Sequence, residues 1–149
     1  MEIEKKFLIK KVPELSSTPY KIIKQGYLNE SRPTLRIRQI NEQYFLTYKY
    51  HKGGNKVNIS EEYELPISKE CFDNLSTKII GKMISKKRYY IKMENYLIEL
   101  DVFENRLVLA EVEFKSAEEA SNFIKPSWFG KDVTENKCYR NVYMALNSW

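Results

Sequence analysis

The chain has 149 residues and a mass of 17.8 kDa, a size that predicts a single domain over residues 1–149. Its hydrophobic content of 42% suffices for a core, and its net charge of +5 indicates either an anionic partner or a lysine-rich surface. The lack of a long apolar run excludes a helical membrane protein, and the lack of a visible leader together with cysteines that have no metal-ligand spacing predicts a cytoplasmic location.

In chain order, the alternation of side chains predicts short strands at 2–10, 21–29, 34–40, 43–50, 57–65, 84–92, 96–103 and 107–115. Ser68 is expected to cap a helix that runs to about Ile80 and ends at Gly81. A capping box at 116–119 predicts a second helix that Pro126 ends, and the spacing of apolar residues predicts a last helix at roughly 136–147.

The first expected strand carries its charged side chains on a single face. Successive side chains of a strand point to opposite faces, so Glu2, Glu4 and Lys6 share one face while Ile3 and Phe7 share the other. Two carboxylates about 6.6 Å apart on one face repel each other unless a cation lies between them. The pattern therefore indicates a metal-ion site.

Later strands repeat this arrangement, with an apolar or aromatic residue between two like charges. The pairs are Arg36 and Arg38, Glu62 and Glu64, Lys86 and Arg88, Glu99 and Asp101, and Glu111 and Glu113, with Thr47 and Lys49 as a mixed pair. A solvated face of an open sheet explains any one pair. The whole set, with signs that alternate from strand to strand, favours a closed sheet with the charges inside. The predicted fold class is mainly β (α+β): an eight-stranded antiparallel closed β-barrel, or tunnel, with a charged lumen and a few flanking helices.

The Glu-x-Glu-x-Lys motif at residues 2–6, followed by the later pairs in this order, resembles the CYTH-type triphosphate tunnel metalloenzymes. Residues 25–28 are similar to the second strand of that family, and residues 128–130 to the approach to its last helix. Tyr139 and Asn141 fall where that helix is often marked. The resemblance covers nearly the whole chain and implies a metal-dependent enzyme that acts on triphosphates.

The chain also departs from the family pattern. Leu8 and Cys138 stand where basic residues are common in the family. Both departures reduce the number of groups available to bind phosphate, and they leave the preferred substrate open.

Converging carboxylates from different strands form an oxygen site suited to Mg²⁺ or Mn²⁺. Glu2 and Glu4 are the first candidates as ligands, and the resemblance extends the set to Glu111 and Glu113 because the first and last Glu-x-Glu strands of the family lie close together. Asp101 is the leading extra ligand. The remaining acids either bind a second metal or hold basic side chains in place as supporting residues: Glu62, Glu64 and Glu99.

The bases expected to bind phosphate inside the barrel are Lys6, Arg36, Arg38, Lys49, Lys86 and Arg88. The arginine fork matches phosphate oxygens in pairs, and several bases in one lumen suit a chain of phosphates better than a single phosphate. A register slip of one residue would place Lys87 inside instead of Lys86. The expected catalytic set is Glu2, Glu4, Lys6, Arg36, Arg38 and Arg88.

Three further residues have two readings each. Lys137 and Arg140 either face the tunnel mouth or lie on a solvated helix face, and His51, beside a glycine-rich turn, is expected to be an exposed loop residue rather than a catalytic base.

The function predicted from these residues is the metal-dependent hydrolysis of a linear triphosphate, with inorganic tripolyphosphate as first choice and pyrophosphate and phosphate as products. The resemblance also admits nucleoside triphosphates, thiamine triphosphate, and cyclisation of ATP. A non-catalytic basic barrel that binds single-stranded nucleic acid is an alternative of another class, but paired carboxylates on its binding face would repel phosphates. We therefore expect a small-molecule triphosphate as partner, with no nucleic acid and no membrane, and a homodimer is compatible with the sequence.

Overall fold

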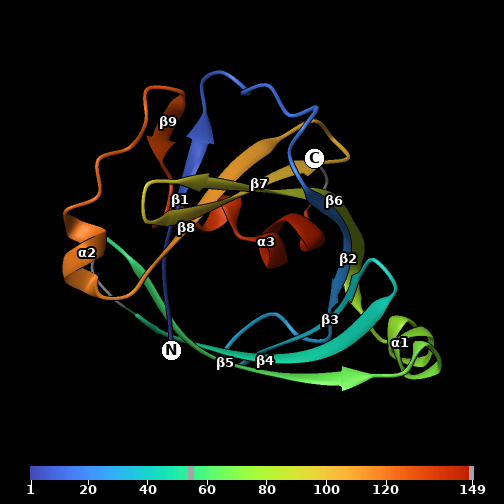
Figure 1. Ribbon diagram of the computed structural model, residues 1–149. Helices are drawn as coiled ribbons and strands as arrows, with labels where there is room; N and C mark the ends of the chain where they lie inside the picture. The colour runs from blue at the N-terminus through green and yellow to red at the C-terminus, as the bar shows by residue number, and fades with distance from the viewer. Residues whose placement is uncertain (54–55, 148–149) are drawn as a thin grey trace.

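A computed structural model describes residues 1–53 and 56–147, and its strands form a closed antiparallel barrel around an open centre (Figure 1). The barrel strands are β1 (Glu2–Ile9), β2 (Tyr20–Tyr27), β3 (Thr34–Ile40), β4 (Gln43–Gly53), β5 (Asn58–Ile67), β6 (Ile80–Met93), β7 (Tyr96–Phe103) and β8 (Val108–Phe114). The other elements are α1 (Lys69–Ser76), α2 (Ala117–Ser121), β9 (Phe129–Asp132), a 3₁₀ turn (Lys137–Tyr139) and α3 (Asn141–Leu146). The predicted eight-stranded closed barrel is confirmed.

Around the ring the strands follow the order β5-β4-β3-β2-β6-β7-β8-β1, and β1 closes the ring by pairing again with β5. The closing seam is short: Glu2 lies opposite Ser60, Ile3 opposite Ile59 and Glu4 opposite Asn58. Further along the same edge, β1 pairs with β9 at Phe7 and Ile9, so β9 lies outside the ring. One edge of β1 is therefore shared between two strands, while its other edge pairs with β8.

One apolar cluster lies outside the barrel wall, between the strands and the elements that cover them. Phe7 on the outer face of β1 packs against the rings of Phe123 and Phe129, at centroid distances of 5.8 and 4.9 Å. A second cluster of buried residues lies beneath α3 and includes Met144 and Ala145. The first cluster thus covers the outer face of the barrel. The strand residues of the second cluster, among them Ile84, Phe103 and Leu109, share a strand face with inner charged residues and pack inside the barrel against α3.

The helices are shorter than the sequence predicted. Ser68 caps α1 as expected, because its hydroxyl accepts a hydrogen bond from the Cys71 N–H at 3.1 Å, but the helix ends at Ser76 and β6 already begins at Ile80. Gly81 does not end a helix; it lies inside β6 with φ +65°, where a Cβ would come within 2.1 Å of the carbonyl oxygen of Ala145. Its role is to let α3 approach the strand.

The capping box at residue 116 also forms, since the Ser116 hydroxyl accepts from the Glu119 N–H at 3.0 Å, but α2 ends at Ser121, well before Pro126. The last predicted helix divides into the 3₁₀ turn and α3, and β9 was not predicted. In Figure 1, α3 lies within the outline of the ring, where it contacts β6 and β2. The helices of the described ranges are too short and too polar to cross a bilayer.

Candidate active site

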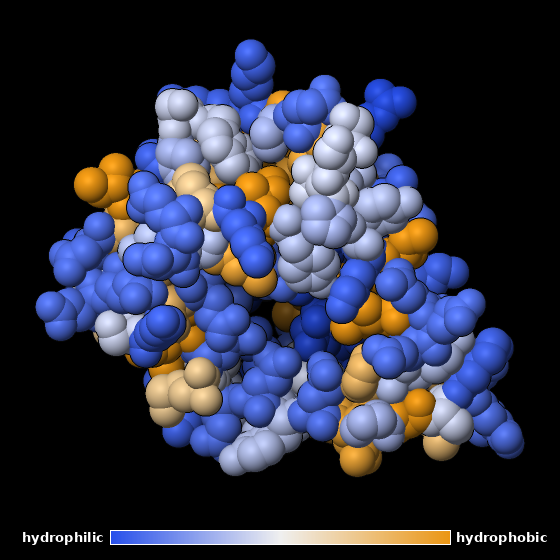
Figure 2. All heavy atoms as spheres, viewed as in Figure 1, coloured by the Kyte–Doolittle hydropathy of each residue, from blue (hydrophilic) through white to orange (hydrophobic). Residues whose placement is uncertain are grey.

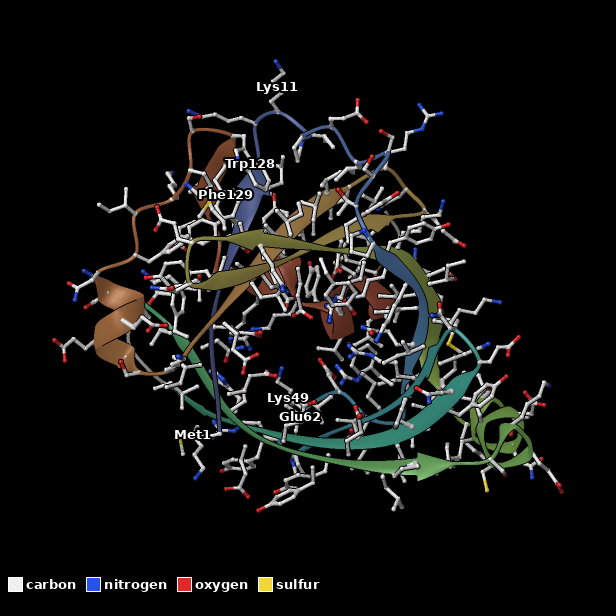
Figure 3. The ribbon with its side chains drawn as sticks, in the orientation of Figure 1. Met1, Lys11, Lys49, Glu62, Trp128 and Phe129 are labelled. Carbon is white, nitrogen blue, oxygen red and sulfur yellow. The ribbon has the colours of Figure 1, made fainter. Side chains whose placement is uncertain are left out.

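The barrel encloses a cavity of about 910 Å³, lined largely by charged and amide side chains. Figure 2 shows a hollow near the middle of one face of the molecule, bordered mainly by hydrophilic residues. In Figure 3, Lys49 from β4 and Glu62 from β5 point into the open centre of the ring. The alternation of each strand therefore places the predicted charges on the inner wall, as the fold prediction required.

The two signs of charge occupy different halves of the ring. We call β7, β8, β1 and β5 the acidic arc, whose inner acids are Glu99, Asp101, Glu111, Glu2, Glu4 and Glu62, and β4, β3, β2 and β6 the basic arc, whose inner bases are Lys49, Arg36, Arg38, Lys86 and Arg88. The alternation of signs from strand to strand is therefore a property of the sequence and not of the ring. It follows sequence order, but β2 pairs with β6, so the order around the ring differs.

Carboxylates crowd one another in the acidic arc. Lys49 reaches across from β4 and contacts Glu2 Oε1 at 2.9 Å and Glu4 Oε1 at 3.7 Å. Burial and the nearby carboxylates of Glu111 and Glu2 nevertheless raise the pKa of Glu4 to about 8. A buried carboxylate group with a single shared ammonium is short of positive charge, and this shortage favours the binding of a cation.

Lys6 is the base that the acidic arc itself supplies. Its ammonium lies 3.6 Å from Glu111 Oε1 and donates a hydrogen bond to the carbonyl oxygen of Tyr139 at 2.9 Å. Although burial opposes the shift, Lys6 and Arg88 hold the pKa of Glu111 well below its ordinary value. Glu111 is thus ionised and held between two bases.

In the basic arc, Arg88 is anchored by acids from the next strand. Its Nε and Nη2 donate to Asp101 Oδ1 and Oδ2 at 2.7 and 2.9 Å, and its Nη1 donates to Glu99 at 3.3 Å. Lys86 Nζ lies 2.8 Å from Asp101 Oδ2, and both side chains are 1% exposed. Both oxygens of Asp101 are therefore occupied by bases, an arrangement that suits a supporting residue better than the metal ligand that the sequence suggested.

Arg36 is less completely satisfied. Its Nη2 lies 3.8 Å from Glu62, while within the described residues its buried Nε has no hydrogen-bond partner. The hydroxyl of Thr47, which lies directly opposite Arg36 on β4, is buried without a partner as well. Unpaired buried donors are costly, and Arg36 lines the cavity, so its guanidinium is suited to a ligand rich in oxygen.

A divalent cation would have to complete its coordination with ligand atoms. Among residues 1–53 and 56–147, no group of three His, Cys, Asp or Glu side chains forms a metal site on its own. Glu2 and Glu4 supply hard oxygen ligands from one strand face, and Mg²⁺ is commonly held by one or two carboxylates together with phosphate oxygens and water. The residues present thus fit a cation held jointly by the acidic arc and a phosphate ligand.

Not every predicted residue reaches the cavity. Glu64 and Glu113 are exposed and do not line it, although Glu113 lies opposite Glu4 and Glu64 lies opposite Thr47 in the strand pairing. Partial burial and the acids Glu2 and Glu62 still raise the pKa of Glu113, so it lies near the rim. The register places Lys86 inside and Lys87 outside, where its ammonium lies 5.2 Å from the centre of the Tyr20 ring.

The cavity also contains residues that the sequence did not single out for it. His51, expected in an exposed loop, lines the cavity, and burial with Arg140 and Arg32 nearby lowers its pKa. Lys137 and Arg140 line it as well, so of their two predicted positions, the tunnel mouth and a solvated helix face, the structure supports the first. Gln25 was missed as a site residue, since a neutral amide between charged strands leaves no charge pattern to detect.

Comparison with known proteins gives a consistent result. The family model of the CYTH domain matches residues 1–137. The chain is 40% identical to an inorganic triphosphatase of Nitrosomonas europaea, covering 98% of this chain and 97% of the relative. It is 33% identical to an inorganic triphosphatase of Acetivibrio thermocellus, covering 99% of this chain and 95% of the relative. A crystal structure of an inorganic triphosphatase superposes with a TM-score of 0.72 at 38% identity, covering 99% of this chain and 95% of that one.

Proposed function

The chain belongs to the CYTH domain family, and on that premise we propose that it is a metal-dependent triphosphatase that hydrolyses inorganic tripolyphosphate to pyrophosphate and phosphate. One observation carries this proposal: carboxylates and guanidinium groups face each other across a single enclosed cavity. The bases suit a chain of phosphates, while the acids suit a cation that bridges to it.

The residues of the basic arc would bind and orient the phosphates. Arg36 and Arg38 present guanidinium forks from one face of β3, and Lys49 on β4 and Lys86 on β6 add positive charge. Asp101 and Glu99 are proposed to hold Arg88 in place rather than to bind metal. Fixed donors around a chain of phosphates stabilise charge that develops when its terminal anhydride bond breaks.

Glu2 and Glu4 would hold the cation, with Glu111 nearby. When bound, Mg²⁺ or Mn²⁺ neutralises phosphate charge and polarises the bond to be cleaved. The barrel wall encloses these groups, which strengthens their electrostatic effect by limiting contact with bulk water. Glu113 at the rim and the exposed Glu64 are proposed to contribute less than the sequence suggested.

Steady-state kinetics with tripolyphosphate, ATP and pyrophosphate test the substrate. We expect the highest kcat/KM for tripolyphosphate, because phosphate-binding groups dominate the lining, and we expect pyrophosphate to be a poor substrate. Each reaction is run with Mg²⁺, with Mn²⁺ and with a chelator, and the products are identified. Preference for ATP, or formation of cyclic AMP, would show that the substrate is misassigned.

We also propose the class of partner and the cellular location of the protein. The lumen charges are enclosed by the barrel, which supports a small-molecule substrate rather than a nucleic acid. A cytoplasmic location accords with the exposed free cysteines Cys71 and Cys138. A filter-binding measurement with single-stranded DNA, with and without Mg²⁺, tests the first of these, since tight metal-independent binding would contradict it.

A further inference from the structure

Gln25, on β2 in the middle of the basic arc, is completely buried and makes three hydrogen bonds. Its Oε1 accepts from Arg38 Nε at 2.9 Å, and its Nε2 donates to the hydroxyl of Tyr27 and to Asn141 Oδ1, both at 2.9 Å. Arginine can only donate, so the oxygen of Gln25 must face Arg38 and its amino group must face Asn141. The orientation of the amide is therefore fixed by its neighbours.

Asn141, the first residue of α3, continues this chain of hydrogen bonds. Its Oδ1 accepts from Gln25 and also from Lys86 Nζ, at 3.0 Å. Lys86 in turn contacts Asp101, which holds Arg88. One side-chain oxygen from the C-terminal helix thus joins the Arg38 side of the basic arc to the Arg88 side.

The partners of the two arginines differ in charge. Arg88 is bound by carboxylates, whereas Arg38 donates to a neutral amide oxygen, and no carboxylate of residues 1–53 or 56–147 forms an ion pair with it. Burial, with Arg36 and Arg88 nearby, lowers the pKa of Arg38 to about 10, so it still carries its charge at neutral pH. An amide can orient a guanidinium without cancelling that charge.

We propose that Gln25 and Asn141 are positioning residues: the neutral amide of Gln25 orients Arg38 toward the cavity and leaves its positive charge available to the phosphate chain, and Asn141 holds that amide in place. Asn141 also accepts from Lys86, whose charge is already paired with Asp101. The inference rests on the proposed triphosphatase function. It also gives α3 a role in the site, because the helix supplies the oxygen that two parts of the basic arc share.

Replacing each amide by the isosteric carboxylate distinguishes a positioning role from a merely structural one. Gln25→Glu keeps an oxygen for Arg38 and adds a negative charge, so a structural role predicts an unchanged or higher melting temperature and unchanged kinetics. A positioning role predicts a KM for tripolyphosphate that rises about tenfold, because the new carboxylate competes with phosphate for Arg38. Asn141→Asp should also raise this KM, because it puts a negative charge on the cavity lining beside the Gln25 amide that holds Arg38.

Gln39→Glu is the matched control. Gln39 follows Arg38 on β3 but faces the outer side of the barrel, where its amide donates to the carbonyl oxygen of Asn41 at 2.9 Å. Gln39→Glu adds the same negative charge next to Arg38 in the sequence but outside the cavity, and the KM of this variant should stay at the wild-type value. Melting temperatures of all variants establish that they are folded.

A raised KM in Gln25→Glu and Asn141→Asp, with Gln39→Glu unchanged, supports the proposal. An unchanged KM in a folded Gln25→Glu overturns it, and if that variant does not fold, Asn141→Asp at the cavity edge decides in the same way. Wild-type protein that neither hydrolyses nor binds tripolyphosphate in calorimetry would instead refute the proposed function. The hydrogen-bond link itself is then read from the Nε–H resonance of Arg38, which must shift in Gln25→Met.

Discussion

Carboxylates of the acidic arc crowd one another, whereas three bases of the basic arc, Arg38, Lys86 and Arg88, are each held by hydrogen-bonded neighbours. Glu4 lies near two other carboxylates and shares Lys49 with Glu2, so its pKa rises to about 8. Arg88, by contrast, has two carboxylates that bind it directly. The comparison indicates that the acidic arc is incomplete without a cation, while the basic arc is already organised before a phosphate arrives.

The strongest test of this difference is Glu4→Gln. The variant should keep its fold, since it removes a charge that burial disfavours, yet lose about a thousandfold in metal-stimulated phosphate release. Phosphate release from tripolyphosphate at saturating Mn²⁺ measures the loss. Near-normal activity under these conditions would remove Glu4 from the metal site and break the comparison at its acidic side.

Breaking the anchor of the basic arc should mainly affect stability. Asp101→Asn removes the buried counter-charge of Lys86 and the bidentate partner of Arg88, which keeps only Glu99 and Glu111, and should lower the free energy of unfolding at pH 7 by about 3 kcal/mol. Denaturant unfolding monitored by circular dichroism measures it. Exposed Asp73→Asn on α1, which has an ion pair with Lys69 at the surface, is the control and should change little.

The same variant carries a pH signature. Although burial opposes the shift, Arg88 and Lys86 hold the pKa of Asp101 below its ordinary value of 3.8. This carboxylate therefore contributes stability above pH 3.8 that is lost as the pH falls through its lower folded pKa. Asp101→Asn should flatten that part of the acid-unfolding curve, and an unchanged curve would contradict the assignment.

A smaller loss is expected when single guanidinium groups are removed. Arg36→Ala and Arg38→Ala should each lower kcat/KM by about a hundredfold, with only partial recovery in the lysine variants because the fork is lost. Lys69→Ala at the surface is the control. Full kcat and KM in both alanine variants would show that the bases of β3 do not bind phosphate.

The smallest effect is expected at Lys87, whose side chain lies on the opposite side of the barrel wall from that of Lys86. Lys87→Ala should leave kcat/KM at the wild-type value and change the free energy of unfolding by no more than about 0.5 kcal/mol. The reason is that its side chain lies outside the barrel over Tyr20. Lys86→Ala, one residue earlier, should raise the KM for tripolyphosphate. Equal effects of the two substitutions would mean that β6 has another register in solution.

Alternation along single strands could be read from the sequence, because the period of two places Arg36 with Arg38 and Lys86 with Arg88 whatever the rest of the chain does. Which strands are neighbours around the ring could not be read from this alternation. The pairing of β2 with β6 is set by packing between segments about sixty residues apart, and it separates the two signs of charge into arcs. The roles of the individual residues remain predictions until they are tested.

Local signals failed where a distant segment decided the outcome. Gly81 resembles the end of a helix, but its positive φ serves the close approach of Ala145 from α3. Gln25 carries no charge and so escaped a search based on charge patterns. Asn141 was noticed for its position in the family pattern alone, because its contacts with Gln25 and Lys86 exist only after the barrel has closed.

The pairing of β1 with β8 also bears on the order in which a nascent chain can fold. Lys6 lies opposite Glu111, so the strand made first by the ribosome finds this neighbour only when about a hundred more residues have been synthesised. The hairpins from β2 to β5 join segments close in sequence and can form early. During translation, Glu2 and Glu4 therefore lack this partner strand until β8 has been synthesised, and the acidic arc closes late.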